Sequence, residues 1–222
     1  MSITFELRDT IALINLGDTE NRFSTEWMAQ FDGALDECLG SPANAVVTCA
    51  GDKFYSNGLQ VELLMGDPET SAAYIARVEG LLARVLTFPM HTVAAMPGHA
   101  FGAGAMLSLA HDAAVMRRDR GFICYPEVDL RMPFPPGMAA LIQGKLPPAT
   151  WVEAMTTGRR YSAPDAQQAQ MIRETADLDN VVDVAVARAL AVGPKDRTAV
   201  GRIKEHIFAP ILEVLTRPLA DR

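Results

Sequence analysis

Residues 99–112, HAFGAGAMLSLAHD, carry a Gly-Ala-Gly sequence directly before an apolar pattern with helical spacing. Small residues at Gly102, Ala103 and Gly104 leave backbone N–H groups accessible at the start of a helix, where the helix dipole strengthens them as donors to a developing oxyanion. The alternative is a tight turn that lets the helix pack closely against a strand. A dinucleotide-binding loop does not fit, because Leu107 occupies the position of the third glycine.

Residues 54–60, FYSNGLQ, form a second loop that could supply a donor to the same oxyanion. This loop follows the apolar run 45–50, AVVTCA, and Gly58 permits a sharp turn at its tip. A single N–H group makes a weak oxyanion hole, so a second donor is required by the chemistry. The alternative is an ordinary Asn-Gly turn without a catalytic role.

Glu127 is the candidate acid and base, in the stretch YPEVDL of residues 125–130. It stands between a proline and a valine, directly after an expected strand. An apolar environment disfavours the charged carboxylate and raises its pKa, which suits a general base. A surface glutamate at a strand end is the alternative, and Asp129 is the rival carboxylate.

These candidate residues must be positioned by an alternation of strands and helices. Apolar runs and turn residues predict strands at 3–7, 10–16, 45–50, 92–96, 112–116 and 121–124. Helical spacing predicts helices from Ser24 or Thr25, over 69–87, 103–110, 138–145, 148–157 and 163–170, and over 178–192 and 196–217. This order predicts an α/β fold in which strands cease after about residue 130, with Asp112 ending the helix that begins at Ala103.

The composition predicts one globular domain and excludes several classes of partner. The 222 residues are 49% apolar and carry a net charge of −7, which makes nucleic acid an unsuitable partner. No signal-peptide pattern and no membrane-spanning apolar run is present. Three cysteines without metal or disulfide spacing and four histidines without metal-like spacing predict buried thiols, no metal site and a reducing, cytoplasmic location.

Taken together and in this order, the three stretches resemble the crotonase superfamily, the enoyl-CoA hydratase/isomerase family. FYSNGLQ is similar to the family's F-S-x-G-x-D loop, and residues 97–112 resemble its G-x-A-x-G-G-G loop with the following helix. Residues 125–137, YPEVDLRMPFPPG, resemble its P-E-x-x-x-G-x-x-P-x-x-G segment. The resemblance implies a crotonase (ClpP-like) spiral of ββα units over residues 1–145, and a helical region over 146–222 that forms a homotrimer or hexamer.

The resemblance also implies which residues bind acyl-CoA, the expected substrate, with no separate cofactor. Carried over position by position, the two backbone donors of the oxyanion hole fall on Asn57 and Ala103. Met65 and Met132 are candidates for lining an acyl pocket, with core packing as the alternative. The residues expected to contact substrate are Ser56, Gly58, Leu59, Gly102 and Met106.

One position separates two reactions within this resemblance. Hydratases use two glutamates, and the first of them falls on Met106, whose thioether cannot take a proton. A single glutamate, here Glu127, resembles the Δ3,Δ2-enoyl-CoA isomerases of fatty acid metabolism, in which it moves a proton from C2 to C4. Hydration, thioester hydrolysis or another acyl-CoA reaction on this fold is the alternative, and a non-catalytic acyl-CoA binder is a third possibility.

Overall fold

The computed structural model describes residues 2–217, which are organised around a six-stranded sheet. β1 (Thr4–Arg8) and β2 (Ile11–Asn15) form the predicted antiparallel hairpin. The remaining strands are parallel, in the order β2, β3 (Ala45–Cys49), β5 (His91–Met96), β7 (Ala113–Arg117) and β9 (Glu174–Ala176). All five residues of β3 are buried, as expected for a parallel strand covered on both faces.

A smaller three-stranded sheet carries the stretches singled out in the sequence. It pairs β4 (Phe54–Ser56), β6 (His99–Phe101) and β8 (Ile123–Cys124) in parallel order. Sequence patterns predicted the residues of β4 and β6 as loop and turn, whereas the structure forms two short strands there. Because parallel strands end at the same sheet edge, this small sheet brings the three motif segments together.

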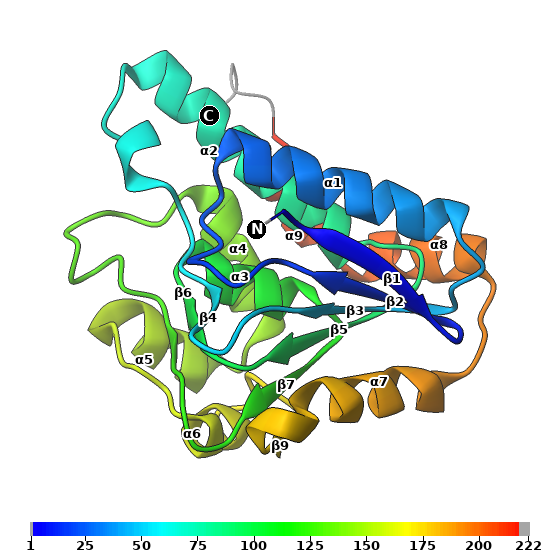
Figure 1. The fold of residues 1–222 in the computed structure, drawn as a ribbon. Helices are drawn as coiled ribbons and strands as arrows, with labels where there is room; N and C mark the ends of the chain where they lie inside the picture. The colour runs from blue at the N-terminus through cyan, green and yellow to red at the C-terminus, as the bar shows by residue number, and fades with distance from the viewer. Residues whose placement is uncertain (1, 218–222) are drawn as a thin grey trace.

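Helices cover both faces of the main sheet (Figure 1). On one face lie α1 (Thr25–Gly40), α2 (Pro68–Leu86) and α3 (Ala103–Ala110), and on the other lies α7 (Val181–Val192), whose Ala185 and Ala189 pack on Val47 and Val93. Ser24 caps α1 by accepting a hydrogen bond from the Trp27 N–H group, as predicted. The remaining elements are η1 (Val61–Leu63), α4 (Pro136–Lys145), α5 (Pro148–Thr157), α6 (Ala163–Gln168), η2 (Leu178–Asn180), α8 (Arg197–Ile207) and α9 (Ala209–Leu215).

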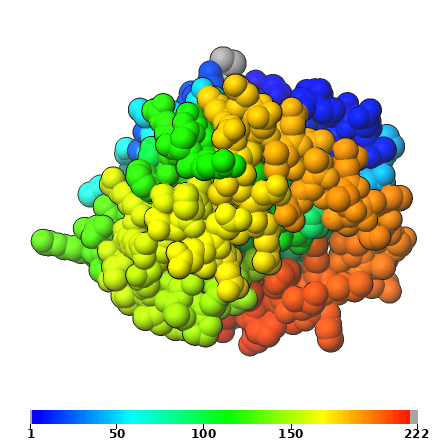
Figure 2. All heavy atoms as spheres, turned by 90° about the horizontal axis from the view of Figure 1, so that it is seen from below, coloured from blue at the N-terminus to red at the C-terminus, as the bar shows by residue number. Residues whose placement is uncertain are grey.

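Two expectations for the C-terminal third were wrong. The strand β9 was not predicted, yet it extends the main sheet beside β7. The helix expected over 196–217 is broken at Phe208, because Pro210 has no N–H group to continue the helical hydrogen bonds. Seen from below, the chain after about residue 145 covers most of one face of the molecule (Figure 2). The division at residue 145 stays a prediction, and across it β9 and α7 pack with the sheet.

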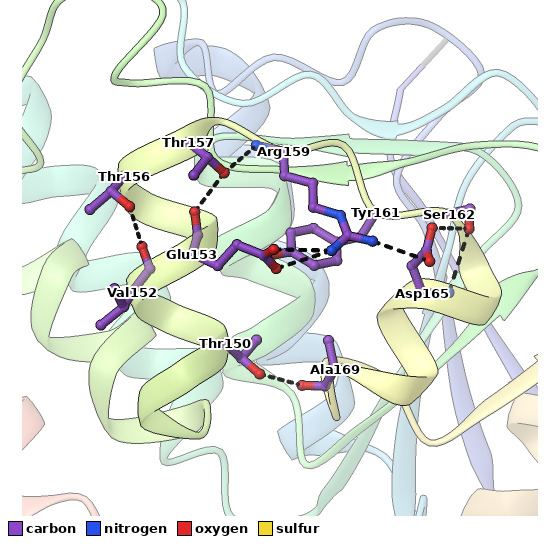
Figure 3. A network of polar contacts seen from close by, with 10 residues as sticks. All are labelled: Thr150, Val152, Glu153, Thr156, Thr157, Arg159, Tyr161, Ser162, Asp165 and Ala169. Atoms are coloured by element: carbon purple, nitrogen blue, oxygen red, sulfur yellow. Dashed lines mark hydrogen bonds and ion pairs between the residues drawn. The ribbon is translucent and has the colours of Figure 1, made fainter.

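The turn between α5 and α6 is clamped by charged and aromatic side chains (Figure 3). Arg159 pairs with Glu153 of α5 and with Asp165 of α6, and its guanidinium lies 4.8 Å from the centroid of the Tyr161 ring. Tyr161 in turn exchanges two backbone hydrogen bonds with Ile123 of β8. The clamp therefore fixes this turn against the strand that precedes Glu127.

Of the helices described in residues 2–217, none combines the length and apolar composition that a membrane span requires.

Asp112 ties the C-terminal helix α8 to the main sheet. α3 ends at Ala110, the last residue of the predicted helix. Two residues later, the Asp112 carboxylate accepts hydrogen bonds from the Thr92 N–H group (2.8 Å) and from the Lys204 ammonium (2.6 Å). Lys204 also donates to the Met90 carbonyl oxygen and is buried. Burial opposes ionisation of Asp112, but the hydrogen bond from the His91 ring and the charge of Lys204 hold the pKa of its carboxyl well below its usual range.

We predict that Lys204→Met lowers the free energy of unfolding by about 3 kcal/mol, because it leaves a buried carboxylate without its cation. Chemical denaturation at neutral pH measures this change. The exposed Lys195→Met is the control and is expected to alter stability by less than about 0.5 kcal/mol. Equal stability of both variants would contradict the assignment of Asp112 as an anchor.

Candidate active site

The loop after β4 and the first turn of α3 are in backbone contact. A Cβ atom at Gly58 would lie 2.5 Å from the Phe101 carbonyl oxygen and 3.0 Å from the Ala103 nitrogen. A Cβ atom at Gly104 would lie 2.3 Å from the Ser56 carbonyl oxygen. The approaches to the two carbonyl oxygens are too short for any side chain, so glycine is required at both positions. The two predicted loops therefore meet at the N-terminus of α3.

Glu127 reaches this junction from the turn that follows β8. The Gly102 N–H group donates to the Cys124 carbonyl oxygen (2.9 Å), which joins the end of β8 to the start of α3. The turn itself is closed by the Met132 N–H group, which donates to the Glu127 carbonyl oxygen (3.0 Å). A Cβ atom at Gly102 would lie 3.8 Å from Glu127 Oε1. The carboxyl group thus lies beside the start of the helix.

Burial raises the pKa of the Glu127 carboxyl to about 7. Its Oε2 atom is buried, and no hydrogen-bond partner for it is present among the described residues. Desolvation of the carboxylate is the first cause of the shift, and a hydrogen bond from the Glu127 backbone opposes it only in part. At neutral pH the group is consequently divided between its acid and base forms, as a proton-transfer residue requires.

A cavity of about 260 Å³ lies between the two loops and the Glu127 turn. Its lining includes Asn57 and Leu59 of the first loop, Gly102 and Ala103 at the start of α3, and Glu127. Apolar side chains from Leu64, Leu130 and Met132 complete much of the wall. A carboxyl group and a helix N-terminus in one apolar cavity form an arrangement suited to proton abstraction with charge stabilisation.

The backbone donors differ in part from the predicted ones. The Asn57 N–H group donates to the Glu20 carbonyl oxygen (2.8 Å), and the Gly58 N–H group donates to Ser56 Oγ (3.1 Å). Asn57 is therefore committed to the neighbouring segment, which corrects its assignment as an oxyanion donor. The N–H groups of Leu59 and Ala103 have no acceptor among the described residues, and both residues line the cavity.

The other predicted residues divide between the cavity, the core and the surface. Leu59, Gly102 and Met132 line the cavity, whereas Met65 is 82% exposed and does not. Ser56 is buried behind the loop, where its hydroxyl donates to the Asn21 carbonyl oxygen (2.7 Å). Met106 is fully buried in the apolar core and is not among the residues that line the cavity.

The rival carboxylate is excluded from the site. Asp129 is exposed and lies against the turn after α5, where a Cβ atom at Gly158 would lie 2.6 Å from its Oδ2 atom. Glu127 is thus the one acidic residue among the described residues that line the cavity.

Arg22 is a cavity residue that sequence patterns did not indicate. Its guanidinium donates to the Leu59 carbonyl oxygen (3.3 Å) and pairs with Glu20 (2.7 Å). It belongs to a segment that runs along the first loop, in which the Phe23 N–H group donates to the Gly58 carbonyl oxygen (2.9 Å). No sequence motif connects these two segments, so only the folded chain reveals the contact.

This fold is that of the crotonase superfamily, as the motifs predicted. The structure matches human mitochondrial delta3-delta2-enoyl-CoA isomerase with a TM-score of 0.89 and 18% sequence identity, covering 100% of this chain and 89% of that chain.

The chain belongs to the enoyl-CoA hydratase/isomerase family, whose model matches residues 6–221. The chain is 30% identical over 222 residues to the peroxisomal enoyl-CoA delta isomerase 2 of Arabidopsis thaliana, covering 96% of this chain and 91% of the relative. It is 32% identical over 165 residues to the peroxisomal enoyl-CoA delta isomerase 1 of the same plant, covering 72% of this chain and 69% of the relative.

We predict that Glu127→Gln stabilises the fold above neutral pH. Burial raises this carboxyl pKa from 4.5 to about 7, so the folded chain binds the proton more tightly than the unfolded chain. The resulting destabilisation is absent below pH 4.5, grows as pH rises to 7, and reaches at most about 3 kcal/mol above it. Melting temperatures of both proteins at pH 4.5 and pH 8 measure this; a pH-independent difference would contradict a buried, unpartnered carboxylate.

Proposed function

We propose that this protein is an enoyl-CoA isomerase that converts 3-enoyl-CoA into 2-trans-enoyl-CoA. The observation that carries the proposal is the buried Glu127 carboxyl, which faces a cavity shared with the N-terminus of α3. Its raised pKa makes it a base at neutral pH and an acid once it has taken a proton. Two relatives that are 32% and 30% identical to this chain are named enoyl-CoA delta isomerases, which supports the same reaction here.

The proposed reaction moves one proton across one face of the substrate. The Glu127 carboxylate removes a proton from C2, and the electron pair of that C–H bond delocalises into the thioester carbonyl. The resulting dienolate carries its negative charge on the thioester oxygen. Glu127 then returns the proton to C4, so the C3–C4 double bond is lost and a C2–C3 double bond forms. The net change is an isomerisation without water or redox chemistry.

We propose the N–H groups of Leu59 and Ala103 as the donors to this oxygen. Neither has an acceptor within the described chain, and Ala103 is the first residue of α3, where unpaired N–H groups and the helix dipole favour negative charge. Each oxyanion donor contributes about 3–4 kcal/mol to transition-state stabilisation in enzymes of known mechanism. This assignment keeps Ala103, as predicted from the sequence, and replaces the predicted Asn57 by Leu59.

Isomerisation is favoured over hydration because one carboxyl suffices for it. A hydratase must hold and activate water with a second polar group, and the position expected for it carries the buried Met106. A purely binding role would not use the proton-transfer capacity that the raised pKa gives Glu127. Turnover of crotonyl-CoA to the hydroxyacyl product would favour the hydratase alternative.

We further propose a trimeric or hexameric assembly and a cytoplasmic location for the protein. The three cysteines are buried free thiols, and burial raises the pKa of Cys38 to about 12 and those of Cys49 and Cys124 to about 11. Such thiols are unreactive, which is compatible with a reducing compartment. Analytical ultracentrifugation tests the assembly.

We predict that Glu127→Gln lowers kcat with 3-hexenoyl-CoA by about a hundredfold to ten-thousandfold, because the amide cannot accept the C2 proton. In the unaltered protein, kcat/KM is expected to fall about tenfold per pH unit below pH 7 and to level off above it, since only the ionised carboxyl is a base. Formation of the conjugated 2-enoyl thioester, followed by its ultraviolet absorbance, measures both.

Asp129→Asn is the matched control for this experiment. It removes a carboxylate two positions away that is exposed and outside the cavity, so its kcat and its pH profile are expected to remain those of the unaltered protein. Undiminished turnover in Glu127→Gln, or equal losses in both variants, would overturn the role proposed for Glu127.

We predict a second effect at Arg22, the cation in the cavity wall. We propose that its guanidinium, which also pairs with Glu20, contacts a phosphate of the CoA nucleotide through charge and hydrogen bonding. Arg22→Ala is expected to raise KM for 3-hexenoyl-CoA about tenfold with little change in kcat, because a phosphate contact is made equally in the ground state and in the transition state. The matching pantetheine thioester, which lacks the nucleotide, should show no such difference; an equal rise in its KM would place Arg22 in a structural role.

A further inference from the structure

Three polar side chains form a hydrogen-bonded chain inside the apolar core. The Oγ1 atom of Thr48 in β3 lies 2.7 Å from the Tyr55 hydroxyl and 3.0 Å from Nε2 of the His111 ring. The Nδ1 atom of the same ring lies 2.8 Å from the Leu107 carbonyl oxygen. Thr48, Tyr55 and His111 are each at most 2% exposed. Polar groups buried this deeply depend on one another for hydrogen bonds, so the three side chains act as one network.

The carbonyl group at one end of this network fixes the direction of every hydrogen bond in it. A carbonyl oxygen only accepts, so His111 Nδ1 carries the proton that is donated to Leu107. Burial lowers the pKa of the His111 ring to about 4, so the ring is neutral at pH 7 and its Nε2 atom is an acceptor. The Thr48 hydroxyl therefore donates to Nε2 and accepts from the Tyr55 hydroxyl. One tautomer of His111 satisfies the whole network.

The network connects the same two elements that meet beside the catalytic cavity. Tyr55 belongs to β4 and directly precedes Ser56, whose carbonyl oxygen would lie 2.3 Å from a Cβ atom at Gly104 of α3. Leu107 lies in the last turn of α3, and His111 is the residue at which that helix ends. The side chains of the network do not line the cavity. β4 and α3 are thus joined twice, by backbone contact at the cavity and by hydrogen bonds away from it.

Stability alone does not account for this network. Tyr55 stands at the phenylalanine of the F-S-x-G-x-D motif that residues 54–60 resemble, so its hydroxyl is an addition to that motif. Replacing both partners of a buried hydrogen bond by apolar groups of the same shape is nearly neutral for stability. A satisfied polar network, in contrast to apolar packing, imposes fixed distances and directions on the elements that it joins.

The position of Leu107 determines that of Ala103, the residue that we assign as an oxyanion donor. The two residues are four positions apart in one helix, which is about 6 Å along its axis, so they move together. Groups that stabilise a transition state must be held within about 0.5 Å of their productive position. A shift of α3 at its Leu107 end is therefore large enough to misplace the Ala103 N–H group.

We propose that His111 is a positioning residue for the Ala103 N–H group, and that with Thr48 and Tyr55 it holds α3 at a fixed height and rotation against β4. It contacts neither the cavity nor Glu127 and acts only through the helix. The inference rests on the oxyanion role of Ala103 in the proposed function. It concerns kcat more than KM, because the charge on the thioester oxygen develops in the transition state.

Thr48 and Thr92 provide a matched pair of variants. Both are 1% exposed and lie on the neighbouring strands β3 and β5, but the Thr92 hydroxyl donates to Asp112 and lies outside the network. We expect Thr48→Val to lower kcat with 3-hexenoyl-CoA about tenfold and to change KM by less than about twofold. Thr48→Ser, which keeps a hydroxyl, should retain the kcat of the unaltered protein. Thr92→Val should lose stability and keep its kcat. Thermal melting establishes that each variant is folded at the assay temperature.

Two further measurements cover the case in which Thr48→Val does not fold. Tyr55→Phe removes a single oxygen atom from the network and is expected to lower kcat about threefold. NMR of the unaltered protein, labelled with ¹⁵N in its histidines, should show His111 protonated at Nδ1 and unchanged between about pH 6 and pH 8. An Nε2–H tautomer, or titration of His111 in this range, would overturn the network as described.

The outcomes distinguish this inference from the proposed reaction. An unaltered kcat in Thr48→Val, or an equal loss in Thr92→Val, would overturn the positioning role and leave the isomerase proposal standing. If the unaltered protein shows no turnover, the proposed reaction fails, and the Ala103 N–H resonance then tests the positioning role. Hexanoyl-CoA should shift this resonance downfield in the unaltered protein and in Thr48→Ser, and less in Thr48→Val. An equal shift in all three proteins, or no shift in any, would overturn the role of His111.

Discussion

The site depends on one close approach of two backbones, between the loop after β4 and the first turn of α3. Gly58 and Gly104 stand where any side chain would overlap the neighbouring carbonyl oxygen. The sequence patterns allowed either a packing turn or a donor for an oxyanion, and the close packing in the structure is compatible with both. Close packing is what brings the unpaired N–H groups of Leu59 and Ala103 to the same cavity.

Glu127 imposes an unfavourable requirement of its own. Its Oε2 atom is buried without a hydrogen-bond partner among the described residues, so the surrounding structure must hold it there. The C-terminal third of the chain provides part of the structure that holds the Glu127 turn in place. The Cys124 thiol donates to the Gly158 carbonyl oxygen (3.2 Å), and Tyr161 pairs with the strand before Glu127. The ion pairs of Arg159 hold this turn in place. The helical region is thus a support of the site as well as a cover of the sheet.

Local signals predicted well those elements that local forces determine. Ser24 caps its helix, and α3 spans the predicted residues, because capping and apolar spacing act within a few positions. Contacts between distant segments could not be predicted in this way. The strand β9 is only three residues long and exists because β7 offers it hydrogen bonds. Asn57 was assigned as a donor from the resemblance of its loop to the family motif, and nothing in that loop reveals that Glu20 accepts its hydrogen bond. The side chain of Arg22 enters the cavity wall through the same long-range contact.

The absence of charge on α3 has an electrostatic consequence. All eight of its residues are buried, and neither its first nor its last turn carries an ionised side chain. Water and counter-ions, which ordinarily weaken the field of a helix at a protein surface, are kept away from its whole length. The aligned peptide dipoles therefore act through a medium of low polarisability, where the same partial charges produce a stronger potential. A fully buried, apolar helix is therefore a better source of positive potential at its N-terminus than an amphipathic helix of the same length.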